Sequence, residues 1–247
     1  MQDLTRLLIS KERLECNHKG SFKLTNEEVH YLNKVMRLRI GEKIYIINGE
    51  GALWEGIKSE NNIINILNYE EPLIFQKKKE FLIGIAIAMP KNGFTEFLRM
   101  ATEIGVDIIQ PLISDRTIKK NLNYEIKKNR WDSIIKESVE QSERLWSPII
   151  KKNINIKDWI IQIMKRDIVL VSITRNKSCL NLRDWLKINH NSITNKKNNI
   201  LWNVIGPEGG WSSDEIHLFD KNQLAYVSLS KNILRTPTAA LSATSII

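Results

Sequence analysis

The sequence predicts an α/β protein with two domains, a small β-rich domain followed by a larger domain with a parallel sheet. Three observations support this fold class. Residues 81–88 form a continuous apolar run and residues 200–205 a second, largely apolar one, as is typical of strands buried on both faces of a parallel sheet. Strand-like and helix-like patterns alternate between these runs. The first 70 or so residues instead contain short strand-like runs joined by tight turns, which favours a small barrel.

The amino-terminal domain, residues 1–72, is predicted to be mostly β. Short strands are expected at residues 5–9, 43–47, 52–58 and 63–67. Thr25 and Glu28 have the spacing of a capping box, which predicts one short helix ending near residue 35. Arg37 and Arg39 alternate with apolar residues, so they could present two guanidinium groups on one face for contacts with phosphates. A solvated strand edge explains the same alternation equally well.

The second domain is predicted to comprise residues 73–247, because the composition shifts within residues 70–79, which are interpreted as a linker. Strands are expected at residues 81–88, 108–113, 168–173, 200–205 and 224–229, and helices at residues 94–104, 125–145 and 179–188. Gly105 should end the first of these helices. Ser212 and Glu215 form a second capping box, and a last helix should begin near Thr236. Residues 189–199 are polar and are interpreted as a surface insertion.

Polar loops follow the last two predicted strands. The first is Gly206-Pro207-Glu208-Gly209-Gly210, and the second spans residues 230–235. Glycines at the carboxyl end of a strand allow a ligand to approach the backbone closely, and ligands of open α/β sheets bind at that end. The two loops are therefore expected to form one pocket. Taken alone, the glycine loop could equally be a simple turn.

The pair of loops resembles the knotted carboxyl end of the SPOUT methyltransferases. The residues concerned are Gly206-Pro-Glu-Gly-Gly and Leu229-Ser-Lys-Asn-Ile-Leu-Arg-Thr-Pro-Thr-Ala. They most resemble the RsmE-type enzymes, which methylate N3 of a uridine in small-subunit ribosomal RNA. Residues 30–41, 89–91, 103–107 and 137–145 are similar to the same family, so the resemblance covers nearly the whole chain.

The resemblance implies an enzyme that uses S-adenosylmethionine to methylate 16S ribosomal RNA, within the 30S subunit. It also implies a trefoil knot in the second domain, a homodimer, and an amino-terminal PUA-like β-barrel that contacts RNA through Arg37 and Arg39. The residues expected to surround the cofactor are Ser172, Ile173, Thr174, Gly206, Pro207, Glu208, Gly209, Leu229, Ile233, Leu234 and Thr236.

Methylation at N3 requires that this nitrogen lose its proton, so a base or a stabiliser of the developing anion is needed. Arg235 could stabilise an anion on a uracil oxygen, and Glu208 could accept a proton if it is buried. Gln141 and Arg144 would lie three residues apart on one face of the long helix, where they could hold a flipped nucleotide. An exposed polar face is the plainer interpretation of this pair. Pro237 stands where the family usually has Glu, which puts in doubt an essential carboxylate at that position.

Composition and absent motifs limit the alternatives. The net charge of +9 favours a polyanionic partner, although the abundance of Lys, Asn and Ile indicates that compositional bias contributes to it. The spacing of the four histidines and two cysteines predicts neither a metal site nor a disulfide framework. The motifs of P-loop NTPases, common dinucleotide-binding folds and α/β-hydrolases are missing.

Neither a membrane-spanning stretch nor a signal-peptide pattern is found, so a cytoplasmic protein without a membrane partner is expected. Two other functions stay open. One is a SPOUT methyltransferase that acts on a different nucleotide of ribosomal or transfer RNA. The other is a non-catalytic RNA-binding relative, against which the intact cofactor loop argues.

Overall fold

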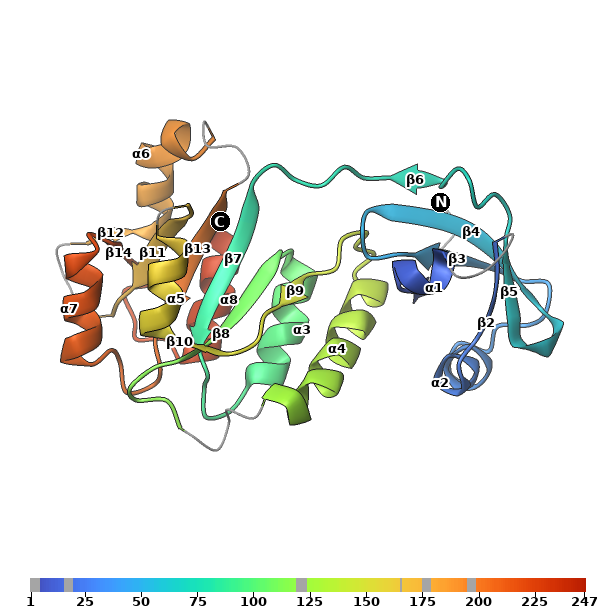
Figure 1. Ribbon diagram of the computed structural model, residues 1–247, viewed down its shortest axis with the longest axis horizontal. Helices are drawn as coiled ribbons and strands as arrows, with labels where there is room; N and C mark the ends of the chain where they lie inside the picture. Colours follow the sequence, from blue (N-terminus) through green and yellow to red (C-terminus); the bar gives the residue numbers. More distant parts are fainter. Residues whose placement is uncertain (1–4, 16–19, 119–123, 165, 175–178, 195–198) are drawn as a thin grey trace. The chain divides into compact units, whose positions relative to one another are not determined.

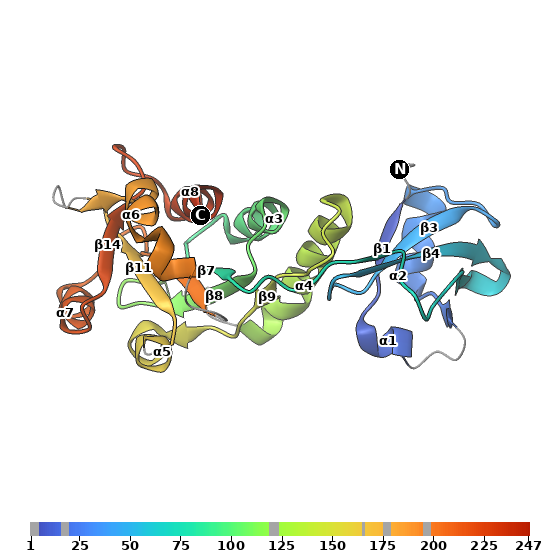
Figure 2. The same cartoon turned by 90° about the horizontal axis from the view of Figure 1, so that it is seen from above.

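The computed structural model describes residues 5–15, 20–118, 124–164, 166–174, 179–194 and 199–247 (Figures 1 and 2). The chain divides into two compact units. The first consists of Met1–Lys78 with Lys136–Ser147, and the second of Lys79–Ile135 with Pro148–Ile247. Residues 136–147, which the sequence pattern assigned to the second domain, thus belong to the first unit.

The first unit is built on a six-stranded sheet that forms a half-barrel. The strand order is β1 (Arg6–Leu8), β3 (Lys43–Ile47), β4 (Ala52–Ser59), β5 (Ile63–Ile66) and β2 (Ser21–Lys23), with β6 (Ile74–Phe75) paired to the start of β4. β1 and β3 are parallel, and the other pairs are antiparallel. The predicted strands are therefore confirmed, but β6 lies within the segment that was interpreted as a linker.

Short helices accompany this sheet. They are α1 (Lys11–Glu15), α2 (Asn26–His30), a π-helical turn η2 (Tyr31–Val35) and a 3-10 turn η3 (Glu60–Asn62). The predicted capping box at Thr25 is confirmed, because its side chain accepts a hydrogen bond from the backbone N–H of Glu28, and the Glu28 carboxylate accepts one from Thr25 N–H. The core of the unit is apolar and includes the fully buried Leu32, Ile44 and Ile64.

The strand-like alternation predicted around Arg37 and Arg39 is wrong. Residues 36–40 form an irregular loop in which Arg37 has a φ of +54°, and Met36 and Ile40 are 41% and 63% exposed. The cause is the buried side chain of Lys58, whose ammonium group donates hydrogen bonds to the Leu38 carbonyl and to Asn33 Oδ1. This contact holds the chain in a loop, on which both arginines are exposed.

The second unit contains an eight-stranded parallel sheet. Its order is β10 (Ile154–Asn155), β8 (Ile108–Ile113), β7 (Leu82–Ala88), β13 (Ile200–Ile205), β11 (Ile168–Ser172), β14 (Ala225–Ser228) and β12 (Leu180–Asn181), with β9 (Ile149–Ile150) also paired to β8. The sheet confirms the parallel α/β class that the buried apolar runs predicted.

Helices cover both faces of this sheet (Figure 2). The helices α3 (Phe94–Ile104), α6 (Leu182–Thr194) and α8 (Thr236–Ile246) pack on one face, together with the beginning of α4 (Tyr124–Gln141). The other face is covered by α5 (Ile156–Ile163) and α7 (Ser213–Lys221). Within the described part of the chain, no helix combines the length and apolar character needed to cross a membrane.

Two of the predicted helices have different boundaries. The long helix α4 ends at Gln141 rather than near residue 145. The helix predicted at residues 179–188 begins at Leu182 and continues to Thr194, so the first part of the supposed surface insertion is helical. Gly105 ends α3 in the left-handed conformation, and Ser212 and Glu215 form the capping box of α7, as predicted.

Candidate functional site

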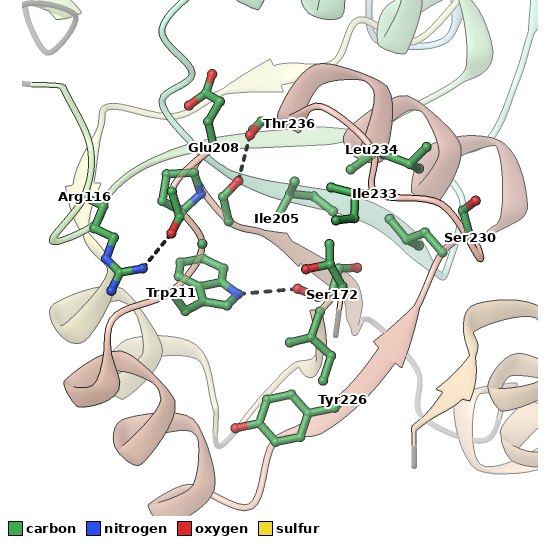
Figure 3. Close-up of a pocket in the computed structure, with 18 of the residues that line it drawn as sticks. Arg116, Ser172, Ile205, Glu208, Trp211, Tyr226, Ser230, Ile233, Leu234 and Thr236 are labelled. Carbon is green, nitrogen blue, oxygen red and sulfur yellow. Dashed lines mark hydrogen bonds between the residues drawn. The ribbon is translucent and has the colours of Figure 1, made fainter. Parts of the chain in front are cut away.

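A pocket of about 700 Å³ lies in the second unit, at the carboxyl ends of β11, β13 and β14 (Figure 3). All eleven residues predicted to surround a cofactor line it: Ser172, Ile173, Thr174, Gly206, Pro207, Glu208, Gly209, Leu229, Ile233, Leu234 and Thr236. The two polar loops therefore do form one cavity. Their role as cofactor ligands stays a prediction.

The first loop keeps its shape because of two contacts at Gly206. A Cβ atom at this position would lie 3.0 Å from the indole ring of Trp211, so the absence of a side chain permits the ring to pack against the backbone. The Gly206 carbonyl accepts a hydrogen bond of 3.0 Å from Thr236 Oγ1, at the start of α8. This bond joins the glycine loop to the end of the second loop (Figure 3).

A third loop, which follows β8, closes the same side of the pocket. Arg116 Nη1 donates a hydrogen bond of 2.6 Å to the Gly209 carbonyl. Asp115 is held at the start of α7, where its backbone N–H donates to Glu215 Oε1 (2.9 Å) and its carboxylate accepts from Ser212 Oγ (2.5 Å). The capping box of α7 thus also positions the loop that carries Arg116.

In the pocket wall formed by β11 and β13, two polar side chains, Ser172 and Asn203, contact each other. Ser172 Oγ donates a hydrogen bond of 2.6 Å to Oδ1 of Asn203, a residue that is 0% exposed. The Ser172 carbonyl accepts a longer bond of 3.4 Å from Trp211 Nε1. Ser172 is therefore fixed through both its side chain and its backbone.

Tyr226 lines the far side of the pocket and donates a hydrogen bond of 2.6 Å to Asp220 Oδ1. Burial, and then this hydrogen bond to the carboxylate, raise the pKa of the Tyr226 hydroxyl well above its ordinary value. The phenol therefore stays protonated at neutral pH and cannot serve as a base.

Glu208 was predicted to accept a proton only if it is buried, and it is not buried. Glu208 is exposed, and its Oε1 accepts a hydrogen bond of 3.0 Å from the backbone N–H of Lys91. Glycines on its carboxyl side leave the loop tip open to solvent, so the carboxylate is not buried as a general base near neutral pH would require.

Arg235 is the residue that precedes α8, and its side chain is exposed. It is absent from the pocket lining, and its guanidinium group makes no hydrogen bond or ion pair with the described residues. The catalytic role of Arg235 stays a prediction.

The shared helical face predicted for Gln141 and Arg144 is wrong. Gln141 is the last residue of α4, and Glu143 has a φ of +62°, so Arg144 lies beyond a turn. The chain turns here because of contacts within the first unit: Glu143 pairs with Arg6 Nη1 at 2.6 Å, and the Leu145 carbonyl accepts from Gly51 N–H at 2.8 Å. Neither residue lines the pocket.

Several residues that line the pocket were not among the predicted cofactor contacts, and the three with the most informative hydrogen bonds are Arg116, Trp211 and Tyr226. Arg116 follows the carboxyl end of a predicted strand, so the rule that identified the other two loops could have found it. Trp211 and Tyr226 gave no signal, because an aromatic residue beside a loop or in a strand is usually part of a core. In the described residues, no three His, Cys, Asp or Glu side chains are grouped so that they could hold a metal ion.

Comparison with known families identifies the class of protein to which this fold and pocket belong. Residues 77–247 match the RNA methyltransferase domain, and residues 24–57 match the RNA methyltransferase PUA domain. The first match covers the whole second unit, together with residues 77–78 and 136–147 of the first, and it includes every pocket residue. The chain is an RNA methyltransferase.

Individual relatives specify the family. The ribosomal RNA small subunit methyltransferase E of Synechocystis sp. is 30% identical over 241 residues, which cover 95% of this chain and 74% of that protein. The protein of the same name from Rickettsia conorii is 31% identical, over 89% of this chain and 85% of that protein. The crystal structure of a ribosomal RNA small subunit methyltransferase E from Neisseria gonorrhoeae, bound to S-adenosyl methionine, has a TM-score of 0.77 and 25% identity and covers 98% of this chain and 95% of that one. The chain belongs to the ribosomal RNA small subunit methyltransferase E family, which confirms the resemblance seen in its two loops.

Proposed function

We propose that the protein transfers a methyl group from S-adenosylmethionine to N3 of a uridine in 16S ribosomal RNA. The observation that carries this proposal is the single pocket in which the two carboxyl-terminal loops meet (Figure 3). Family membership and the cofactor bound to the Neisseria gonorrhoeae relative support the cofactor assignment. The resemblance of the loops to RsmE-type enzymes supports the uridine N3 target.

The residues present fit S-adenosylmethionine. A volume of about 700 Å³ is within the usual range for small-molecule sites. Ile205, Ile233 and Leu234 provide an apolar wall that suits a purine ring, while the backbone of the glycine loop offers donors and acceptors without side chains in the way. The closely packed Gly206 and Trp211 fix the position of that backbone.

S-adenosylmethionine supplies an activated methyl group, so the reaction needs no covalent intermediate on the protein. The task of the chain is to hold both reactants in line and to exclude water, and such positioning alone can lower a barrier by about 7–11 kcal/mol. The hydrogen bonds from Thr236 to Gly206 and from Arg116 to Gly209 keep three loops in fixed register for this purpose.

The N3 proton must also leave the uracil. We assign to Arg235 the stabilisation of the negative charge that develops on a uracil oxygen, and its unengaged, exposed guanidinium group supports this role. Gln141 and Arg144 are proposed to contact the nucleotide independently of each other, since they do not share a helical face. Glu208 is proposed as a cofactor contact only, because its exposure is unfavourable for a base.

The amino-terminal domain, proposed as residues 1–72, would bind the RNA, and residues 73–247 would carry out methyl transfer. The loop at residues 36–42 supports the first role, because it presents Arg37 and Arg39 to solvent and is held by Lys58. Two exposed guanidinium groups on a fixed loop suit phosphate contacts.

Several finer features of the family are proposed on the same grounds. They are a trefoil knot, a homodimer, action on the assembled 30S subunit, and a cytoplasmic location. The packing of α8 against β7 and β13, after β14 has paired with β11, supports a carboxyl end folded back into the sheet, as a knot requires. Sedimentation at micromolar concentration tests the dimer, since a species near 28.7 kDa would contradict it.

The decisive experiment uses ribosomal RNA from cells that lack this protein. Purified protein, treated with a chelator, is incubated with isotopically labelled S-adenosylmethionine and either naked 16S RNA or 30S subunits, and the nucleosides are mapped by mass spectrometry. We expect label in 3-methyluridine, and none in RNA from wild-type cells, where the position is already methylated. Label in another nucleotide would favour a different target, and no label in any nucleotide would favour a non-catalytic RNA-binding protein.

A further inference from the structure

Asn203 is a buried polar residue in the middle of the sheet of the second unit. It belongs to β13, between β7 and β11, where it pairs with Ile85 and Leu170. Its side chain is 0% exposed and lies on the same face of the strand as Leu201 and Ile205, which are part of the apolar core. This position is one at which an apolar residue is expected.

Only half of the Asn203 amide is satisfied. Its Oδ1 accepts the hydrogen bond of 2.6 Å from Ser172 Oγ, but its Nδ2 has no partner within the part of the chain that the structure describes. A buried N–H group without a partner costs free energy, and replacing a polar pair by apolar groups of similar shape is often neutral or stabilising. Folding alone therefore gives no reason for Asn at this position.

The consequence of the contact lies at Ser172. This residue ends β11 and lines the pocket, so its hydroxyl group is available to a ligand. Because the hydroxyl proton is committed to Asn203 Oδ1, the lone pairs of Ser172 Oγ remain to accept a hydrogen bond from the pocket side. The bond from Trp211 Nε1 to the Ser172 carbonyl limits movement of the same residue.

We propose that Asn203 is a positioning residue that orients the Ser172 hydroxyl as an acceptor for an N–H or O–H group of the cofactor. The inference rests on the proposed function, because it requires that this pocket holds S-adenosylmethionine. Asn203 itself does not touch the ligand. It acts only through Ser172, and it does so at a cost to the stability of the free protein.

Replacing Asn203 by an apolar residue should therefore change cofactor affinity and protein stability in opposite directions. In Asn203→Leu the unsatisfied Nδ2 is removed from the core, so the melting temperature of the free protein should be unchanged or higher. The Ser172 hydroxyl then has no fixed proton acceptor, and affinity for S-adenosylmethionine should fall about three- to tenfold, as for the loss of one hydrogen bond. A residue with a merely structural role would lower both quantities together.

The test uses isothermal calorimetry on the full-length protein with S-adenosylmethionine and with S-adenosylhomocysteine. The variants are Asn203→Leu, Ser172→Ala and the double variant, with thermal melts of each protein without ligand. Each single variant should bind both compounds about three- to tenfold more weakly, and the double variant no more weakly than Ser172→Ala. Thr102→Val is the matched control, because Thr102 is also buried and bonded, to the Leu98 carbonyl, but does not line the pocket.

Three results would overturn the inference. They are wild-type affinity in Asn203→Leu, losses in the two single variants that simply add in the double variant, and a fall in melting temperature that parallels the fall in affinity. If Asn203→Leu does not fold, Asn203→Val makes the same comparison with a smaller side chain. If the wild-type protein binds neither compound, the proposed function itself fails. The three results named above would instead overturn only the role of Asn203 and leave the proposed function intact.

Discussion

The hydrogen bond between Thr236 and Gly206 should matter both for stability and for the shape of the pocket. Thr236 is only 3% exposed, and its Oγ1 donates to the Gly206 carbonyl at 3.0 Å. Thr236→Val keeps the shape of the side chain but removes the donor, leaving a half-buried carbonyl without this partner. The lost hydrogen bond, together with part of the cost of burying the unpaired Gly206 carbonyl, should lower the free energy of unfolding by about 1–2 kcal/mol.

The expected loss can be measured directly. For a protein of this size, about 1–2 kcal/mol corresponds to a fall in melting temperature of about 2–8 °C. Since the bond links the two loops, affinity for S-adenosylmethionine, measured by calorimetry, should fall as well.

Thr244→Val provides a matched control in the same helix. Thr244 is also buried, but its Oγ1 bonds to the Ala240 carbonyl one turn earlier, so its hydroxyl joins no separate segments. Such a bond adds little to helix stability, and this variant should melt nearly as the wild type does and bind the cofactor unchanged. Equal falls in melting temperature for both variants, with cofactor affinity unchanged in each, would refute the role given to the loop-to-loop bond.

Three further outcomes are expected from the first unit. In gel-shift titrations with 16S RNA, replacing both Arg37 and Arg39 by Ala should weaken binding and make log Kd less dependent on log salt, by about one per lost phosphate contact, with cofactor affinity unchanged; an unchanged salt slope would count against the contacts. Lys58→Met removes the ammonium group that holds the loop at residues 36–42, so it should weaken RNA binding while Arg37 and Arg39 remain, and undiminished binding would argue against this role of Lys58. Burial raises the pKa of Glu140 to about 7 from its usual 4.5, so the stability contributed by its protonated form is complete below about pH 4.5 and is lost as the pH rises through about 7. Glu140→Gln should therefore gain stability over the wild type between pH 5 and 8, by up to about 3 kcal/mol in urea unfolding, and a constant difference across that range would contradict the pKa.

The long elements of the fold were predictable because their local signals agree with their tertiary environment. The apolar runs that became β7 and β13 are buried on both faces, and α3 carries an apolar stripe that ends at a left-handed Gly105. The strands β9, β10 and β12 have two residues each. Such pairs exist only because neighbouring strands provide partners, so no local pattern could reveal them.

The end of α4 shows the opposite case, in which tertiary contacts override local preference. The helical pattern continues to Leu145, yet the helix ends at Gln141. Glu143 is held by Arg6, and the Leu145 carbonyl by Gly51 N–H, across more than ninety residues of sequence. These bonds belong to the first unit and could not be seen in the helix's own sequence, which is why the pairing of Gln141 with Arg144 failed.

The pocket was predictable from strand ends, whereas the chemical state of its residues was not. Loops that follow parallel strands converge at one edge of the sheet, and this rule alone brings together the glycine loop and the segment before α8. Burial decides whether a carboxylate can act as a base, and the exposure of Glu208 depends on how Lys91 and the neighbouring glycines are arranged. That arrangement has no counterpart in the local sequence.

Arg235 and Asn203 are alike in that neither suits its place in the fold. Arg235 occupies the cap position of α8, where a short side chain that accepts a hydrogen bond is favoured, and it makes no cap bond. Its positive charge also stands at the end of the helix where the dipole disfavours cations. Residues that break a local rule without compensation are expected at functional sites. An anion held beside Arg235, such as a uracil oxygen carrying charge in the transition state, would turn both disadvantages into favourable interactions, because the helix end and the guanidinium group would then act on the same negative charge.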